Sequence, residues 1–506
     1  MKVHWMKKIS MLASVGIATA MVLSGCAGGT GASSSESGTS ANTSIRIGLT
    51  PSPANLNFEQ TAGQAIPQAL MYNVYESLVK LNENGKTIQP LLAKSWKISN
   101  DGLTYTFNLR SGVKFSNGDP FNASTVKFNL ERLNQWKANT PANLSAIDHV
   151  DAVSNTEAKV VLKEPDRNTL FWLTSVLGAM VDPNEVNNMD TQAIGTGPFT
   201  VSDYKVGSQM DLKRNDSYWG TKPALRTAQL KYYSDTTSSS NALLSGDIDA
   251  IYNFQGYDQI DQFKNDNYTI NTGNAQGDTM LVMNPSKGPF SNIKLRQAVM
   301  YAVDKDRILK TVINGYGTVL SAPVIPSDPW YKNLSSTYKH DTAKAKQLVQ
   351  QSGVKDLTVN FTVPTRPYAQ SIAQIVKTEL DAIGFKVNLT EQEFPAVWIQ
   401  NTMTNKNYDM TAMWHVEARN VTNYGNANYY WNYNNAKVNS DFAAAKKAGS
   451  DTDFNSSMLD AVTQIQQDAP ADWLYNTNLI TITKKGITGF SKNDVGIAMD
   501  LTGVKG

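Results

Sequence analysis

A single cysteine, Cys26, is the feature that most limits how this 506-residue chain can fold. With one thiol no intramolecular disulfide can form, so packing alone must stabilise the folded state. The residues before it have the layout of a secretion signal, in which three lysines precede an uncharged, largely apolar run over 9–23. That run is shorter than the roughly 20 apolar residues of a transmembrane helix. We therefore predict a signal peptide over 1–25 and an extracytoplasmic protein.

The end of this signal, Leu23-Ser24-Gly25-Cys26, resembles the bacterial lipoprotein box. In such proteins the thiol is lipidated and cleavage makes the cysteine the first residue. The resemblance implies lipidation at Cys26, which would anchor the chain to the cell membrane on its outer, or periplasmic, side. Residues 26–43 are rich in Gly, Ser and Thr and predict a flexible linker. The open alternative is an ordinary secretion signal with an incidental cysteine.

The charge of the chain argues against a nucleic-acid partner. Without the three lysines of the signal the 46 basic residues become 43, against 44 acidic residues, a net charge of about −1. The sequence contains no long run of basic or of acidic residues. About 460 residues follow the linker, enough for roughly three domain-sized units, and none of their stretches reaches the ~18 consecutive apolar residues of a membrane span.

The first part of the chain predicts a small mixed α+β unit. Alternation over 45–49 indicates a strand, and apolar residues at helical spacing predict a helix over 65–79. Asp101-Gly102 lies between two alternating runs and predicts a hairpin. A further helix is expected over 125–133.

The later part is more regular and predicts a parallel, helix-covered sheet. The pattern is strand 357–363, helix 369–383, strand 385–389, helix 395–403 and strand 408–414. In such sheets ligands bind at the carboxyl ends of the strands. The third strand ends in the polar segment 415–420, so we expect a site there.

Several stretches of the chain occur together and in a fixed order. They are PLLAKSW followed by DGLTYTFNLRSGVKFSNGDPFNASTVKFNLERL, GTGPF over 195–199, RNDSYWG over 214–220, LLSGDIDA over 243–250 and the motif residues between 284 and 304. In this order they resemble the family 5 extracellular solute-binding proteins, the peptide- and nickel-type receptors of ABC importers. The resemblance extends from about residue 44 to the end.

The resemblance implies an α/β fold of the two-lobed periplasmic-binding-protein type (type II, large cluster C form), with an extra α+β subdomain in the first lobe. It assigns 44–85, 192–284 and 484–506 to the first lobe, 86–191 to the extra subdomain and 285–483 to the second lobe. Two crossing strands would form a hinge that lets the lobes close on a ligand. They are expected near 283–286 and 480–484, and residues 481–483 alternate like an edge strand.

No motif of weight predicts catalysis, a cofactor or a resident metal. The sequence contains no Gly-x-Ser-x-Gly and no His-Glu-x-x-His, and one cysteine cannot form a cysteine zinc site. Gly85-Lys86-Thr87 ends like a phosphate loop, but Lys80 stands where the first glycine is required. We expect a protein that is not an enzyme, with a hydrolase as the remote alternative.

Family peptide receptors typically carry a Gly-Trp-x-x-Asp-Tyr-like stretch, whose Asp receives the ligand's amino group. Here Trp414 matches, Glu417 stands where Asp is expected and Ala418 replaces the Tyr. A partly buried carboxylate binds an ammonium strongly, so the resemblance makes Glu417 the candidate ammonium contact. The departure implies a deeper pocket or a ligand without a free amine, and a solvated loop carboxylate is the plainer interpretation.

Other candidates surround this stretch. Arg366 and Arg419 suit a ligand carboxylate, although each also suits a surface ion pair. His415 could contact a metal or chelate, or be a hydrogen-bonded wall residue. The aromatic, asparagine-rich run 423–433 offers rigid surface with adaptable hydrogen bonds. The remaining ligand-binding candidates are Asn420, Tyr424, Trp398, Asn55, Thr279 and Asn284.

These observations favour a monomeric, lipid-anchored substrate-binding component that captures short peptides and delivers them to ABC permease subunits. A second interpretation keeps the binding class but makes the ligand a nickel or other metal chelate, or an opine-like solute. A third is a peptide-sensing signalling or adhesion receptor that uses the same fold.

Overall fold

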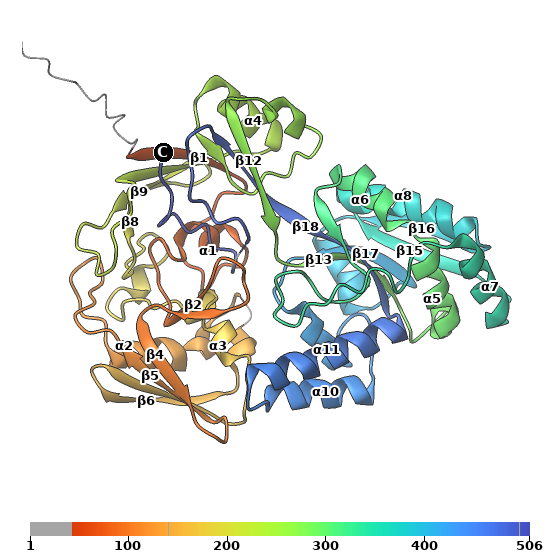
Figure 1. Cartoon of the computed structure of the whole chain (residues 1–506), viewed down its shortest axis with the longest axis horizontal. Coiled ribbons are helices and arrows are strands. Elements are labelled where there is room, and N and C mark those ends of the chain that lie inside the picture. The colour runs from red at the N-terminus through yellow and green to blue at the C-terminus, as the bar shows by residue number, and fades with distance from the viewer. Residues whose placement is uncertain (1–42, 140, 495) are drawn as a thin grey trace, which may run out of the picture. The chain divides into compact units, whose positions relative to one another are not determined.

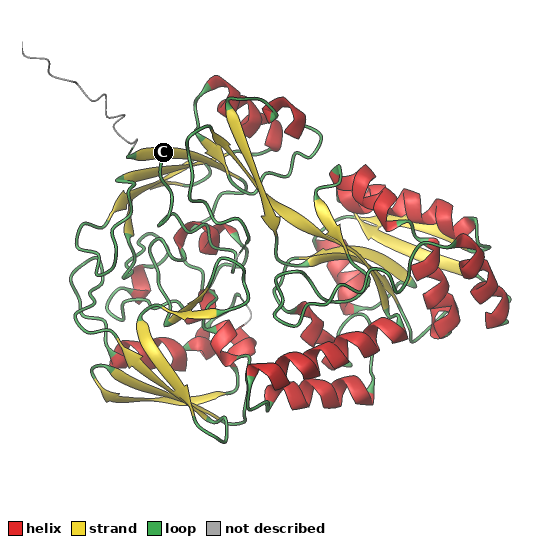
Figure 2. Cartoon of the chain, in the orientation of Figure 1, coloured by secondary structure: helices red, strands yellow, loops and turns green. Residues whose placement is uncertain are grey.

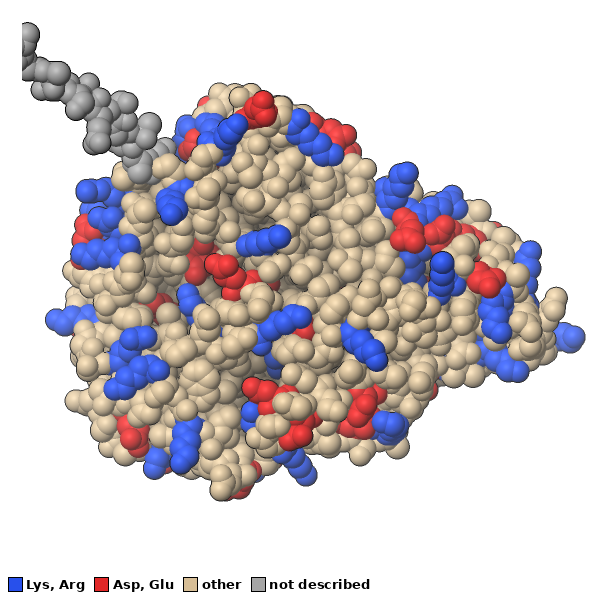
Figure 3. Space-filling model, in the orientation of Figure 1, with Lys and Arg blue, Asp and Glu red and all other residues tan. Residues whose placement is uncertain are grey.

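The computed structural model describes residues 43–139, 141–494 and 496–506, all within one compact unit (Figure 1). The predicted signal peptide, the lipidation site Cys26 and all but the last residue of the predicted linker lie outside the described residues. Within the described ranges, none of the helices has the length and apolar character needed to cross a membrane. Basic and acidic side chains are interspersed on the face seen in Figure 3.

One mixed sheet runs through both lobes, and the long strand β18 (Ala471–Lys484) is shared between them (Figures 1 and 2). The strand order is β16-β15-β17-β13-β18-β11-β1-β10-β9-β8, and β12 and β14 also pair with β18. The first-lobe strands are β1 (Ser44–Leu49), β8 (Phe199–Lys205), β9 (Gln209–Arg214), β10 (Thr227–Tyr232), β11 (Ala250–Ile251) and β12 (Tyr268–Asn274). The second-lobe strands are β13 (Asp278–Met283), β14 (Gly317–Val319), β15 (Thr358–Pro364), β16 (Lys386–Gln392) and β17 (Met410–His415).

The helices cover this sheet (Figure 2). Those of the first lobe are α1 (Ala65–Leu70) and α4 (Thr236–Ser245). Those of the second lobe are α5 (Ile293–Ala302), α6 (Lys305–Ile313), α7 (Thr342–Ser352), α8 (Pro367–Asp381), α9 (Ala396–Trp398), which runs into a π-helix (Ile399–Thr404), α10 (Ala436–Lys446) and α11 (Asp451–Asp468).

The extra subdomain is an antiparallel sheet in the order β4-β5-β7-β6. Its elements are β4 (Ala93–Ile98), β5 (Thr104–Leu109), α2 (Ala123–Glu131), β6 (Ile147–Ser154), β7 (Glu157–Leu162) and α3 (Thr169–Trp172), and a separate hairpin joins β2 (Val79–Leu81) to β3 (Ile88–Pro90). The hairpin predicted at Asp101-Gly102 is confirmed, with Gly102 at φ +72° where a side chain would be strained. The helix predicted over 125–133 is also confirmed, and Asn122 caps its first amides.

The helix predicted over 65–79 is wrong beyond Leu70. The backbone carbonyls of Asn73 and Val74 accept hydrogen bonds from the amides of Phe199 (2.8 Å) and Gly197 (2.9 Å) instead of from amides of the next helical turn. A Cβ on Gly197 would lie 2.5 Å from the Asn73 carbonyl oxygen. The apolar residues of this stretch are buried in an irregular segment. Their spacing in the sequence is the same as that of a helix, although the backbone is not helical.

The alternating strands and helices predicted in the second lobe are confirmed. β15 pairs in parallel with both β16 and β17, so the carboxyl ends of all three strands lie at one edge. Helix α8 connects β15 to β16 and ends before Gly384, which adopts φ +103°. This edge is therefore where we expect a ligand site.

The sheet passes between the lobes at two short segments. β12 pairs with β18 up to Asn274 opposite Asn478, whereas β13 pairs with β17 and reaches β18 at Tyr475. The first-lobe core includes Leu479 and the second-lobe core includes Tyr475. We therefore propose that the lobes join at 275–277 and 476–478 rather than at 283–286 and 480–484, which moves β13 into the second lobe.

The prediction of an edge strand over 481–483 is wrong. Ile482 and Thr483 pair with both β11 and β12, and Thr481 pairs with β12, so this part of β18 is central. Its side chains are buried on both faces, and alternation of Ile and Thr therefore does not mark a solvent-facing side here.

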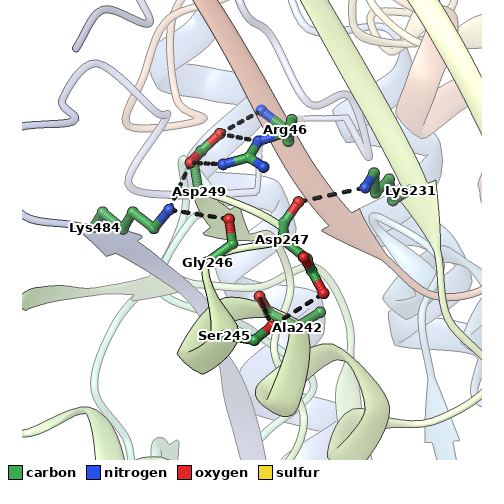
Figure 4. Close-up of polar contacts among 8 residues, drawn as sticks. All are labelled: Arg46, Lys231, Ala242, Ser245, Gly246, Asp247, Asp249 and Lys484. Atoms are coloured by element: carbon green, nitrogen blue, oxygen red, sulfur yellow. Dashed lines mark hydrogen bonds and ion pairs between the residues drawn. The ribbon is translucent and has the colours of Figure 1, made fainter. Parts of the chain in front are cut away.

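The LLSGDIDA stretch fixes the end of β18 in the first lobe (Figure 4). Asp249 accepts hydrogen bonds from the Arg46 backbone amide (3.0 Å), Nε (2.9 Å) and Nη2 (2.7 Å), and from Lys484 Nζ (2.8 Å). Burial alone would raise the pKa of Asp249, but these donors lower it to about 2. One carboxylate thus joins β1, β11 and β18.

The GTGPF and RNDSYWG stretches meet at the buried Glu76. Its carboxylate accepts bonds from Thr196 Oγ1 (2.8 Å), Tyr218 Oη (2.7 Å) and Trp219 Nε1 (2.8 Å). Burial raises the pKa of Glu76 to about 7 although the three donors oppose the shift. We refer to these four residues as the Glu76 network, which packs the first lobe rather than contacting a cavity.

Candidate ligand-binding site

Two cavities lie where the lobes meet, and they have no lining residue in common. The hinge cavity, about 620 Å³, is lined by Tyr257 of the first lobe and by Thr279, Tyr368, Trp414 and Tyr475 of the second, among others. The loop cavity, about 410 Å³, is lined by the first-lobe segment 171–177 and by the second-lobe segment 416–423, which we call the Glu417 loop. Both volumes fall within the roughly 300–1,000 Å³ of small-molecule sites.

The end of β17 explains why the predicted residues divide between these cavities. Successive strand residues point to opposite faces. Trp414 pairs with Thr279, and both line the hinge cavity. His415 pairs with Asp278 on the other face and is buried beneath the Glu417 loop. The residues at and after the end of β17 therefore divide between two cavities on opposite faces of the sheet.

Glu417 presents an ionised carboxylate to the loop cavity. Its side chain is 56% exposed, and its Oε2 lies 3.2 Å from His415 Nδ1. The hydrogen bond from His415 lowers the pKa of Glu417. Among the described residues Glu417 has no Lys or Arg ion-pair partner. Its negative charge is thus available to a cationic ligand group.

Arg419 is buried and is engaged through Nη1, whereas its Nε has no hydrogen-bond partner among the described residues. Its Nη1 donates to Asn168 Oδ1 (2.6 Å), and its guanidinium lies 3.6 Å from the centre of the Phe171 ring. The rings of Trp330 and Phe454 lie at 5.1 and 5.5 Å. Burial lowers the pKa of Arg419 to about 10. Because Asn168 and Phe171 belong to the first lobe, these contacts join the lobes, and we call Arg419, Asn168 and Phe171 the Arg419 latch.

A second ion pair joins the same two surfaces. Arg167, next to Asn168, donates from Nη2 to Asp451 Oδ1 (2.7 Å) and from Nη1 to the Gly449 carbonyl (3.3 Å). Asp451 is the first residue of α11, so the subdomain and the second lobe are in contact beside the loop cavity. Its carboxylate is largely exposed, so we expect this pair to stabilise the contact only weakly.

His415 and Asn420 lie beneath the cavity rather than in its wall. The ring nitrogens of His415 lie within hydrogen-bond distance of Glu417 and of Tyr430 Oη (2.8 Å). Asn420 Nδ2 donates to Asp278 Oδ1 (2.6 Å). Burial raises the pKa of Asp278 to about 6. These groups support the Glu417 loop from below.

The remaining candidates line neither cavity. Tyr424 is buried and stacks on Trp431 at 4.1 Å, while Trp398 and Asn284 are fully buried. Arg366 lies over the Phe394 ring at 4.6 Å, and Asn55 donates to Thr61 (2.8 Å) in a first-lobe loop. Of the aromatic run 423–433, only Asn423 and Tyr429 reach the loop cavity, because its other aromatic rings fill the second-lobe core.

Most of the first-lobe residues that line the loop cavity were not predicted from the sequence. Gln64, Asn139, Trp172 and Ser175 line the loop cavity, together with Gln276 at the crossing between the lobes. Four separate segments supply these five residues, and no pattern in the sequence shows that they meet. Glu417 and Arg419 are the only charged residues in the described lining.

The family of the chain follows from comparison with known proteins. The family model described as "Bacterial extracellular solute-binding proteins, family 5 Middle" matches residues 87–441, more than half of the chain. The chain belongs to family 5. The predicted resemblance is confirmed, and with it a solute-binding protein of ABC importers.

The relatives of this family 5 protein bind different solutes. It is 31% identical over 365 residues to the nickel-binding periplasmic protein of Escherichia coli, covering 67% of this chain and 69% of the relative. It is 26% identical over 458 residues to the glutathione-binding protein GsiB of Pectobacterium atrosepticum, covering 85% and 88%. The family thus establishes solute binding without fixing the solute.

Solved structures confirm the fold. CtaP of Listeria monocytogenes, an ABC transporter substrate-binding protein, superposes with a TM-score of 0.80 at 22% identity, covering 92% of this chain and 99% of CtaP. NikA of Brucella suis, solved with Fe(III)-EDTA, gives 0.79 at 24% identity, with the same coverage. The two-lobed periplasmic-binding-protein fold is therefore as expected.

Proposed function

We propose that this family 5 protein captures short peptides with a free amino terminus in the loop cavity and delivers them to the permease of an ABC importer. The observation that carries the proposal is the Glu417 carboxylate, ionised, half exposed and without a Lys or Arg partner among the described residues. A peptide ammonium would neutralise it in a cavity from which closed lobes exclude water, where a charge-assisted hydrogen bond is strong.

The rest of the lining suits a peptide backbone. Side-chain amides and hydroxyls of Gln64, Asn139, Ser175, Gln276 and Asn423 can pair with its repeating amide groups. Apolar and aromatic walls, among them Trp172 and Tyr429, offer surface to its side chains without selecting charge. Arg419 is engaged in the latch, so the ligand carboxylate is not assigned to it.

The same proposal includes the location of the protein. We infer a monomer held on the outer side of the cytoplasmic membrane by a lipid on Cys26, with residues 26–43 as linker. The lone cysteine after Leu-Ser-Gly and the Gly/Ser-rich segment behind it support this inference. The protein would carry its ligand unchanged, without catalysis.

A metal chelate is the second candidate ligand. The relative named a nickel-binding periplasmic protein and the proximity of His415 to Glu417 favour it. The engagement of both His415 nitrogens opposes it, because a metal would have to displace Glu417 or Tyr430. Within the described residues no group of three or more His, Cys, Asp or Glu side chains is placed to hold a metal ion.

Isothermal titration with a mixed library of dipeptides to pentapeptides tests the proposal. Binding should release or absorb heat, and Glu417→Gln should weaken it by about 2–5 kcal/mol, since one partner of a buried charge pair is lost. That corresponds to a Kd at least roughly 30-fold higher. Glu164→Gln, an exposed glutamate outside both cavities, is the matched control.

The same titration separates the two ligand classes. No heat with any peptide would contradict the peptide proposal. Heat on adding nickel with free histidine, abolished by His415→Ala, would establish the chelate instead. Mass spectrometry of whatever co-purifies with the wild-type protein adds an independent identification.

A further inference from the structure

His415 and Tyr430 form a buried hydrogen-bonded chain that ends on Glu417. His415, the last residue of β17, is 3% exposed. Its Nδ1 lies 3.2 Å from Glu417 Oε2, and its Nε2 lies 2.8 Å from Tyr430 Oη. The His415 and Tyr430 rings are stacked, with centres 5.8 Å apart and planes 22° apart.

The direction of this chain follows from what each group can donate. An ionised carboxylate only accepts, so the hydrogen between His415 and Glu417 belongs to Nδ1. A neutral imidazole then has a lone pair on Nε2, which accepts the hydrogen of the Tyr430 hydroxyl. Burial raises the pKa of Tyr430, so its hydroxyl keeps that hydrogen. The donors therefore run from Tyr430 to His415 to Glu417.

Tyr430 is itself fixed by the second-lobe core. It is 3% exposed, and its backbone carbonyl accepts a hydrogen bond from Tyr408 Oη (2.7 Å). The Trp431 ring meets His415 edge-on at 5.7 Å. The imidazole is thus fixed by Tyr430 and Trp431. The Glu417 side chain is half exposed, and without the bond from His415 it would lose more conformational entropy when the ligand binds.

Resting on the proposed function, we propose that His415 and Tyr430 are positioning residues that set the Glu417 carboxylate for the ligand's ammonium and do not touch the ligand. They make Glu417 a prearranged anion, and prearrangement raises affinity by reducing the entropy lost on binding. Peptides without a free ammonium gain nothing from this arrangement.

The arrangement makes peptide affinity depend on pH. The titratable groups facing His415 are Glu417 on its loop, Tyr430 from the 426–433 segment, and Asp278 on β13, whose Oδ1 is bound by Asn420. Burial raises the pKa of Asp278 to about 6, so acid protonates this carboxylate and removes a negative charge from beside the ammonium site. Acid therefore weakens the binding of free-amine peptides.

Tyr430→Phe tests the positioning role, because it removes one hydroxyl and keeps the ring. We expect the Kd for a free-amine peptide to rise about 3- to 10-fold, as for the loss of one hydrogen bond. The affinity for the N-acetylated peptide should not change. Tyr433→Phe is the control, because Tyr433 is buried nearby and its hydroxyl binds Asp468 instead.

The possible results distinguish a failure of the positioning role from a failure of the proposed peptide binding. If Glu417→Gln leaves the affinity for free-amine peptides unchanged, both fail. If Glu417→Gln weakens binding but Tyr430→Phe has the same affinity as Tyr433→Phe, only the positioning role fails. Nitrogen NMR of the ¹⁵N-histidine-labelled wild-type protein is a second readout without substitution. A hydrogen on Nδ1 of His415 is expected, and a hydrogen on Nε2 alone would overturn the inference.

Discussion

Glu76 and Glu417 are carboxylates in the two lobes, and their surroundings differ in one decisive respect. Glu76 is buried and receives bonds from three side chains, so nothing remains for a ligand. Glu417 is half exposed and receives one bond, from His415. The first carboxylate is fully hydrogen-bonded within its lobe, whereas the second is the one that we propose binds the ligand's ammonium. The donors already present, rather than the residue type, therefore distinguish the structural carboxylate from the proposed binding carboxylate.

The largest expected effect is on stability and comes from Glu76→Ala. Three buried donors would lose their acceptor, so the free energy of unfolding should fall by about 3–5 kcal/mol. Urea denaturation measures the change, with Glu164→Ala as the exposed control. Peptide affinity of the folded fraction should stay unchanged. A loss below ~1 kcal/mol would mean that the Glu76 network does not stabilise the first lobe.

The pH dependence of stability gives the next effect. The pKa of Glu76 is raised from 4.5 to about 7 on folding, so the folded state binds the proton more tightly than the unfolded chain. Its contribution is complete below pH 4.5 and is lost as the pH rises through 7, a change of up to roughly 3 kcal/mol. Glu76→Gln should flatten this decline when unfolding is measured from pH 4.5 to 8. An identical decline in both proteins would assign it to other buried carboxyls.

The smallest effect concerns the Arg419 latch. Asn168→Ala removes the acceptor of a hydrogen bond from a charged group, worth about 1.5–3 kcal/mol, partly offset by the Phe171 contact that remains. The ligand-free protein should open, seen as a larger radius of gyration in small-angle X-ray scattering. Peptide affinity should fall by less than in Glu417→Gln. An unchanged radius, with Asn188→Ala as surface control, would mean that Arg419 does not hold the lobes.

Much of this fold could be predicted because local patterns and tertiary structure agree. The strands and helices between 357 and 415 follow simple periodicity, and the hairpin at Asp101-Gly102 follows turn chemistry. The helix expected over 65–79 ends early because the amides of Gly197 and Phe199, 123 and 126 residues further along the chain, bond to the carbonyls of Val74 and Asn73. A long-range bond of this kind leaves no mark on local spacing.

The site could be predicted only in part, for a similar reason. The carboxyl end of a parallel strand pointed to residues 415–420, and Glu417 does line a cavity there. The sequence could not show that Arg419 would bind Asn168 and Phe171 of the first lobe. Nor could it show that Tyr424 would stack on Trp431 in the second-lobe core. The stretches that reveal the family, such as those meeting at Glu76, pack the lobes and carry no information about the solute.

A double-mutant cycle tests the central claim most directly. One peptide, free or N-acetylated at its amino terminus, is titrated into the wild type and into Glu417→Gln. We expect acetylation to weaken binding to the wild type by at least roughly 30-fold and to have almost no effect on binding to Glu417→Gln, a coupling of about 2 kcal/mol or more. Equal losses on acetylation in both proteins, or none in either, would contradict an ammonium contact at Glu417.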